Sequence, residues 1–126
     1  MSRKAVETNK APQAIGPYSQ AIDLGDLVFV SGQIPLNPET MEIVEGDIKQ
    51  QTIQVMKNLS AVLAEAGLSF DHVAKFTIYL TDMNDFASLN DTYAAFLKAP
   101  YPARATVEVS QLPKGVKVEM DVIAKR

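Results

Sequence analysis

One long amphipathic helix, bounded at both ends, limits the possible folds of this sequence more than any other feature. Its apolar or small residues recur at helical spacing along one stripe: Thr52, Val55, Met56, Leu59, Val62, Leu63 and Ala66. We expect Asp47 to cap the first turn and Gly67 to end the helix just after the stripe. Because only one side of this helix is apolar, that side must pack against another layer of structure.

The sequence before and after this helix predicts strands. Residues 18–34 indicate two strands around a Gly25-Asp26 turn, and the continuously apolar run 27–30 is typical of a strand buried on both faces. The run Val73–Leu80 is rich in β-branched and aromatic residues, which favour a strand.

A second helix and two last strands complete the expected order. The helix is expected to be capped near Asp82 or Asn84, and one of its faces carries Phe86, Leu89, Tyr93, Phe96 and Leu97. Residues 104–109 and 116–124 predict strands. The order ββ-α-β-α-ββ indicates an α+β sandwich with both helices on one face of a sheet. The other face then needs a cover, which self-association would provide.

Size and composition exclude several classes of site. The 126 residues fit a single domain spanning 1–126, without repeats or a linker. The chain has no cysteine and one histidine, His72, so thiolate chemistry is excluded and a His-rich metal site or a Ser-His triad is disfavoured. The net charge of −3 argues against a nucleic-acid binder. No segment has the ~20 apolar residues of a membrane span, and the polar N-terminus does not resemble a signal peptide, so we expect a cytoplasmic protein.

The polar faces of the last two strands are the strongest candidate site. Arg104, Thr106 and Glu108 alternate with apolar residues on one strand, as Glu119 does on the other. If these strands pair as a hairpin, Thr106 lies opposite Glu119, with Arg104 diagonal to it. The alternative is an exposed sheet face whose charges only meet water. If a second subunit covers that face, the guanidinium would instead suit a small carboxylate.

Other polar positions have ordinary structural explanations. Ser31-Gly32-Gln33 follows a buried strand and indicates a turn, as does the segment 16–19 around Tyr18. Asn90 lies off the apolar stripe of the second helix, where an exposed amide is expected, and His72 is expected at the surface or a strand edge.

Long stretches of the chain closely resemble the Rid (YjgF-type) family, in particular its RidA group of reactive-intermediate deaminases. The matching segments are 11–12, 14–20, 31–35, 46–48, 51–52, 82–86, 102–107, 112–114 and 118–120, together with Asn90 and Tyr93. The most specific is Pro102-Ala103-Arg104-Ala105-Thr106-Val107. The resemblance implies a chorismate-mutase-like α+β subunit, a homotrimeric barrel with clefts between subunits, and cofactor-free, metal-free hydrolysis of 2-imino acids or their enamine tautomers to 2-oxo acids and ammonia.

The resemblance also assigns roles to individual residues. Arg104 would hold the substrate carboxylate, and Glu119 would activate water or move protons. Thr106 would offer its backbone carbonyl near the imine nitrogen. The other cleft-lining residues would be Tyr18, Ser31, Gly32 and Asn90.

The sequence departs from the family pattern at three places. Thr106 stands where many relatives carry cysteine, so a thiol role cannot transfer, and Met41 stands where relatives often have glycine. The segment 97–101 is shorter than in some relatives. Two rival functions remain: a non-catalytic 2-oxo-acid-binding, chaperone or regulatory protein, and an endoribonuclease, which the acidic composition disfavours.

Overall fold

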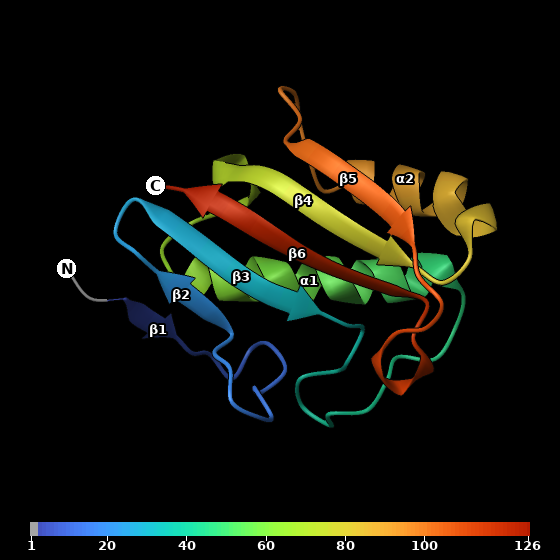
Figure 1. The fold of residues 1–126 in the computed structure, drawn as a ribbon, viewed down its shortest axis with the longest axis horizontal. Helices are drawn as coiled ribbons and strands as arrows, with labels where there is room; N and C mark the ends of the chain where they lie inside the picture. Colours follow the sequence, from blue (N-terminus) through green and yellow to red (C-terminus); the bar gives the residue numbers. More distant parts are fainter. Residues whose placement is uncertain (1–2) are drawn as a thin grey trace.

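The computed structural model describes residues 3–126 and has a six-stranded sheet at its centre, with two helices across one face (Figure 1). The strands are β1 (Lys4–Val6), β2 (Ala21–Asp23), β3 (Leu27–Gln33), β4 (Val73–Leu80), β5 (Ala103–Glu108) and β6 (Val118–Lys125). Their order is β1-β2-β3-β6-β4-β5; β4 and β5 run parallel and all other neighbours antiparallel. The predicted α+β sandwich of two helices on a mixed sheet is confirmed. The short strand β1 was not predicted.

The long helix α1 (Ile48–Glu65) has the ends that the sequence predicts. Oδ1 of Asp47 accepts a hydrogen bond from the backbone N–H of Gln50 at 3.0 Å, and Oε1 of Gln50 accepts from the backbone N–H of Asp47 at the same distance. This capping box satisfies two amide groups that a helix start leaves free. Gly67 follows the helix with a φ of 78°, in the left-handed region that favours glycine.

The apolar stripe of α1 packs on one side of the sheet, which we call the helix face. Its central residues, from Val55 to Leu63, lie in the same core cluster as Phe76, Ile78 and Met120. All three of these sheet residues are fully buried. The opposite side of the sheet carries no helix, and we call it the open face.

The second helix, α2 (Phe86–Ala94), covers the edge of the sheet near β4 and β5 (Figure 1). A 3₁₀ turn, Met83–Asp85, leads into it, and the side chain of Asp82 accepts a hydrogen bond at the start of that turn. The ring of Tyr93 meets that of Phe76 edge-on, with centroids 5.0 Å apart. Aromatic contacts therefore fix this short helix on the sheet. The remaining 3₁₀ turns are Phe70–His72 and Pro113–Gly115.

The last two strands do not form the predicted hairpin. β4 lies between β5 and β6, so Ile78 separates Thr106 from Met120, and Tyr79 separates Val107 from Glu119. The alternation of polar and apolar residues gives the two faces of a strand but not its neighbours. The pairing of Thr106 with Glu119 is therefore wrong.

The orientation of β5 also differs from the expectation. Because paired residues share a face, Arg104 lies on the helix face with Phe76, and the apolar Val107 lies on the open face with Tyr79. Phe29 of β3 points to the open face as well and is 42% exposed, so within one chain the run 27–30 is not buried on both faces. Val107 is 44% exposed. The open face thus shows apolar side chains of the kind that usually mark an interface.

The turn around Met41 has an unusual backbone conformation. Met41 has a φ of 61° where the resemblance marks a departure from glycine, so a residue with a β-carbon occupies the left-handed region there. Within the residues that the structure describes, neither helix is long and apolar enough to cross a membrane.

Candidate active site

Arg104 is held by a cluster on the helix face, formed at the edge strand β5 and along α2. Its Nη1 donates a hydrogen bond to Oδ1 of Asn90 at 2.6 Å. Its Cζ lies 5.4 Å from the centroid of the Phe86 ring and 5.2 Å from that of Tyr93. We call Arg104, Asn90, Phe86 and Tyr93 the Arg104 cluster. It orients the guanidinium while using only part of its five N–H donors.

The surroundings of Arg104 can accept a small anion. A pocket of about 520 Å³ lies beside its guanidinium, lined by Asn90, Tyr93, Ala94, Tyr101, Pro102 and Arg104. Among residues 3–126 no carboxylate forms an ion pair with Arg104. Burial raises the pKa of the Tyr93 hydroxyl, and the charge of Arg104 opposes that rise. The guanidinium is therefore oriented, exposed and not neutralised by an acidic side chain of its own chain.

Thr106 lies two residues beyond Arg104, on the same face of β5. Its hydroxyl oxygen is buried and has no hydrogen-bond partner among the described residues. β5 is an edge strand, so half of its backbone N–H and C=O groups point away from β4. Such an edge leaves backbone groups near Arg104 free for a ligand.

Glu119 lies on the open face of β6, against the end of β3. A β-carbon at position 32 would collide with Oε2 of Glu119, so Gly32 makes room for the carboxylate. Across the β4–β6 pair, Tyr79 stands opposite Glu119, and the Tyr79 hydroxyl donates to Oδ2 of Asp121 at 3.1 Å. We call Glu119, Gly32, Tyr79 and Asp121 the Glu119 cluster.

The Glu119 carboxyl is half-buried. Burial raises its pKa, and the negative charge of Asp121 raises it further. The pKa of Tyr79 is also raised, first by burial and then by the charge of Asp121. A carboxylate with a raised pKa is a stronger base than an exposed glutamate, and a stronger base is better suited to accept a proton.

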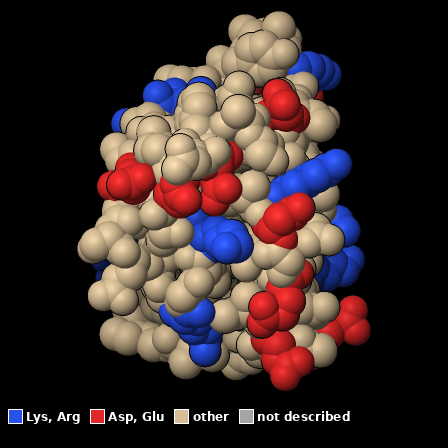
Figure 2. All heavy atoms as spheres, turned by 90° about the vertical axis from the view of Figure 1, so that its right-hand side faces the viewer, with Lys and Arg blue, Asp and Glu red and all other residues tan. Residues whose placement is uncertain are grey.

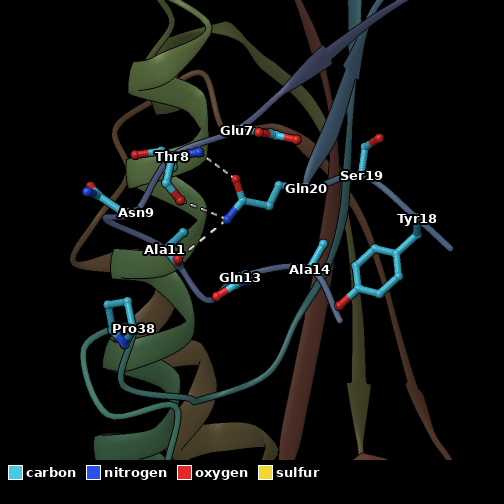
Figure 3. Close-up of a pocket in the computed structure, with 10 residues that line it drawn as sticks. All are labelled: Glu7, Thr8, Asn9, Ala11, Gln13, Ala14, Tyr18, Ser19, Gln20 and Pro38. Atoms are coloured by element: carbon cyan, nitrogen blue, oxygen red, sulfur yellow. Dashed lines mark hydrogen bonds between the residues drawn. The ribbon is translucent and has the colours of Figure 1, made fainter. Parts of the chain in front are cut away.

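Ser31 directly precedes Gly32 of the Glu119 cluster, and Tyr18 lies on the segment that Ser31 holds. The Ser31 hydroxyl donates to the backbone oxygen of Ser19 at 2.6 Å, which ties the end of β3 to the segment that carries Tyr18. Tyr18 is 53% exposed and lines a pocket of about 510 Å³, at the opposite side from Thr8 in Figure 3.

The same pocket shows how the N-terminal loop is fixed. The buried side chain of Gln20 accepts a hydrogen bond from the Thr8 amide at 2.7 Å and donates to the Thr8 carbonyl at 3.0 Å (Figure 3). It also donates to the Pro12 carbonyl at 2.8 Å. Because these contacts use both ends of its amide group, Gln20 is an anchor for the loop rather than a free ligand-binding group.

The structure divides the predicted site residues into two groups. Arg104, Asn90 and Thr106 lie on the helix face near β5, whereas Ser31, Gly32 and Glu119 lie at the ends of β3 and β6. Arg104 and Glu119 are two strands and three register positions apart, or about 14 Å between Cα atoms, and their side chains point to opposite faces. The predicted side-chain contact between Arg104 and Glu119 is therefore wrong within one chain.

Sequence reasoning missed several residues of these clusters. The sequence places Phe86 and Tyr93 on the apolar face of the second helix, and it gives no sign that Asp121 or Tyr79 belongs to a site. The alternation of β6 already placed Asp121 on the face of Glu119; only the register with β4 brought Tyr79 to both.

Charge and metal-binding chemistry add two observations. On the face seen in Figure 2, acidic side chains lie beside basic ones instead of leaving a continuous basic surface. Across residues 3–126, no three His, Asp or Glu side chains gather closely enough to hold a metal ion.

Comparisons with known proteins show what the chain as a whole is similar to. Residues 8–126 match a family model described as Endoribonuclease L-PSP. The chain is 56% identical to Protein DfrA of Myxococcus xanthus, over 98% of this chain and 96% of that protein. It is 51% identical to YyfA of Yersinia pestis, a Rid-family protein of unknown function, with a TM-score of 0.97 over 99% of this chain and 100% of that one.

A third relative carries a name that bears on activity. TdcF of Escherichia coli K12, provisionally named a reactive intermediate deaminase, is 46% identical, with 98% of both chains covered. A crystal structure of E. coli TdcF with bound serine matches with a TM-score of 0.94 at 47% identity, over 98% of each chain.

Proposed function

The chain belongs to the Rid (YjgF-type) family, which includes a relative named for reactive intermediate deamination, and from this premise we propose that it hydrolyses small 2-imino acids. The substrates are 2-aminoacrylate, through its imine tautomer, and 2-iminobutanoate. Water adds to the C=N carbon, the C–N bond breaks, and the products are a 2-oxo acid and ammonia.

The observation that carries the proposal is the oriented guanidinium of Arg104. A planar fork can bind a carboxylate with two parallel hydrogen bonds, which a lysine cannot reproduce. Nη1 of Arg104 donates to Asn90 at 2.6 Å, and the aromatic rings of Phe86 and Tyr93 lie near the guanidinium carbon. The guanidinium is therefore oriented before a substrate binds. The serine bound by TdcF also carries a carboxylate, which supports a ligand of this class.

Glu119 is the group proposed to handle water and protons. Its raised pKa makes it a base that can take a proton from the attacking water as the oxygen–carbon bond forms. The C=N electron pair moves to nitrogen, and the proton on Glu119 is returned to that nitrogen to give a carbinolamine. Glu119 then takes the hydroxyl proton as the C=O bond forms and the C–N bond breaks, and it passes that proton to the departing nitrogen, which leaves as ammonia. The backbone carbonyl of Thr106 and the side chains of Tyr18 and Ser31 orient the substrate.

If one site uses both clusters, it must draw on a second copy of the chain. Since Arg104 and Glu119 of one chain lie on opposite faces of the sheet, we propose that each site combines the Arg104 cluster of one subunit with the Glu119 cluster of its neighbour. The exposed apolar side chains of Phe29 and Val107 support burial of the open face between copies. The proposed assembly is a homotrimer, with a solution mass near three times 13.7 kDa.

A coupled assay tests the activity. Threonine dehydratase releases 2-iminobutanoate, and the measured quantity is the rate of 2-oxobutanoate formation. We expect this protein to accelerate that formation without added metal or cofactor. An unchanged rate at saturating protein would contradict the deaminase function.

Mixing two inactive variants tests the shared site. Arg104→Ala and Glu119→Gln are each expected to be inactive, but co-expressed subunits would form sites that take Arg104 from one variant and Glu119 from the other. Random assembly at equal amounts should restore about a quarter of the wild-type sites. No recovery in mixed trimers verified by mass would place both residues in one subunit's site and overturn the shared arrangement.

The alternative function is a binding protein that uses the same clusters without turnover. Tight 2-oxo-acid binding with no acceleration of imine hydrolysis would favour that alternative. Endoribonuclease activity, the description of the matched family model, would instead require RNA cleavage that survives exhaustive purification and is lost in Arg104→Ala. The mixed charges of the face in Figure 2 do not favour RNA binding.

A further inference from the structure

The open face holds a polar pair, Tyr79 and Asp121, that the proposed hydrolysis does not use. Tyr79 stands directly opposite Glu119 in the β4–β6 register, and Thr77 stands opposite Asp121. The Tyr79 hydroxyl nevertheless donates to Asp121, at 3.1 Å from Oδ2. Its side chain therefore begins beside Glu119 and reaches diagonally to the carboxylate two residues further along β6.

This hydrogen bond leaves Glu119 without a donor from Tyr79. Because the Tyr79 hydroxyl is directed to Asp121, its proton is not donated to Glu119. Within residues 3–126, the Glu119 carboxylate has neither a hydrogen-bond donor nor an ion-pair partner. Such a carboxylate is stabilised less in its ionised form than one that accepts hydrogen bonds.

The other elements around Glu119 supply no opposite charge in contact with it. From β3 come Gly32 and Ser31, whose hydroxyl donates to a backbone oxygen. On the segment leading into β6, Lys117 is exposed, and Lys75 of β4 is paired with Ile123, four residues along β6 from Glu119; neither forms an ion pair with it. Lys117 and Asp121 each lie two residues from Glu119, about 7 Å away between Cα atoms, and of the two it is the charge of Asp121 that shifts the pKa of Glu119.

We propose that Asp121, oriented by Tyr79, is a positioning residue that makes Glu119 a strong enough base to take the proton of the attacking water. This inference rests on the proposed hydrolysis and names the group that increases the base strength of Glu119. Asp121 does not touch the substrate in this arrangement; it acts through its negative charge, which opposes ionisation of Glu119. The raised pKa of Glu119, caused first by burial and then by Asp121, agrees with this role.

The direct test is a carbon NMR titration of the Glu119 side-chain carboxyl in the wild-type protein and in Asp121→Asn. The variant keeps the size of the side chain and a group that can accept from Tyr79, but it removes the charge. We expect the titration midpoint of Glu119 to fall by about 0.5–1 pH unit. An unchanged midpoint would overturn the proposal.

Two further variants separate charge from structure. Asp26→Asn, at the exposed turn before β3, removes the same charge far from Glu119 and should leave its midpoint unchanged. Tyr79→Phe keeps the charge of Asp121 but releases its orientation, so a smaller fall is expected. Equal shifts in Asp26→Asn and Asp121→Asn would reveal an effect of net charge alone and would also overturn the proposal.

The pH profile of kcat/KM then links the titration to the reaction. If Glu119 must be ionised to accept a proton, activity rises with pH through its pKa, and Asp121→Asn should move that rise to lower pH while lowering the plateau by about two- to tenfold. A shifted midpoint with an unshifted profile would remove the positioning role while leaving the deaminase function intact. Absence of any imine hydrolysis by the wild-type protein would instead contradict the proposed function, and the positioning role with it.

Discussion

The Arg104 cluster and the Glu119 cluster differ in how complete each is within one chain. Arg104 has a hydrogen-bond partner and two aromatic neighbours, all on α2. Glu119 has a space made by Gly32 and a like-charged neighbour, Asp121, but no donor within residues 3–126. One region thus presents an oriented positive charge, and the other a half-buried carboxylate that has no hydrogen-bond or ion-pair partner among residues 3–126.

This difference fits the two tasks of the proposed active site. A carboxylate clamp benefits from fixed geometry, which α2 and β5 supply through aromatic packing. A general base benefits from a weakened preference for its charged form, which burial and a nearby carboxylate supply. Because the two environments lie on opposite faces of one sheet, the positive charge of Arg104 does not stabilise ionised Glu119 within one chain.

Replacing Arg104 is expected to have the largest effect on activity and ligand binding. Arg104→Ala is expected to lower kcat/KM by at least about 1,000-fold and to abolish 2-oxo-acid binding, because the carboxylate loses both hydrogen bonds of the fork. Arg104→Lys should recover little, since an ammonium lacks the planar geometry. Kinetics and calorimetric titration measure both effects. Near-wild-type turnover in Arg104→Ala would refute the clamp.

Glu119→Gln should separate catalysis from binding. The amide keeps the shape of the side chain but cannot take a proton, so kcat should fall by about 10²–10⁴-fold while 2-oxo-acid affinity changes little. Steady-state kinetics and calorimetry on the same preparation distinguish the two quantities. An equal loss of affinity would mean that Glu119 organises the pocket and does not handle the proton.

Asn90→Ala tests how far the order of the Arg104 cluster matters. Loss of the 2.6 Å hydrogen bond to Nη1 should raise KM by about tenfold with a smaller effect on kcat, because the guanidinium is then less well oriented for ground state and transition state alike. Asn84→Ala, in the exposed turn before α2, is the matched control. Similar KM values for the two variants would mean that Asn90 has no role in substrate binding.

The pH dependence of stability should show that the Glu119 cluster is unfavourable for folding. A carboxyl whose pKa is raised on folding binds its proton more tightly in the folded state, so stability falls as pH rises from the unfolded pKa through the folded one. Glu119→Gln should therefore be more stable than the wild type at pH 7, by at most about 1 kcal/mol for a half-exposed group, and equally stable near pH 3. Denaturant unfolding across this range is the measurement. A stability difference independent of pH would contradict the electrostatic explanation.

A substitution at Met41 lies outside both clusters and should leave activity unchanged. Its φ of 61° is costly for a residue with a β-carbon, so Met41→Gly is expected to stabilise the protein by up to about 1 kcal/mol. Thermal unfolding, with kinetics as the second readout, checks this. A large loss of turnover would show that the turn affects the site.

The predictions from sequence were most accurate where the signal is local. The ends of α1 follow from Asp47, Gln50 and Gly67, whose interactions span only a few residues. The geometry of the candidate site followed from the sequence only in part. The strands that carry Arg104 and Glu119 were identified, but the contacts of Arg104 with α2 and the place of Tyr79 opposite Glu119 depend on pairings between distant segments.

The sequence by itself determined the helices, the main strands and the two faces of each strand, because the 3.6-residue and two-residue periods of side chains are written into neighbouring positions. Only the tertiary structure decided that β4 enters between β5 and β6 and that the polar face of β5 turns toward α2. Strand order depends on pairings between residues far apart in the chain. So does the choice of which strand face packs against the helices, because the alternation of polar and apolar residues is the same whichever face is inside. For this reason Arg104 and Glu119, which the sequence placed together on one face, lie on opposite faces of the folded sheet.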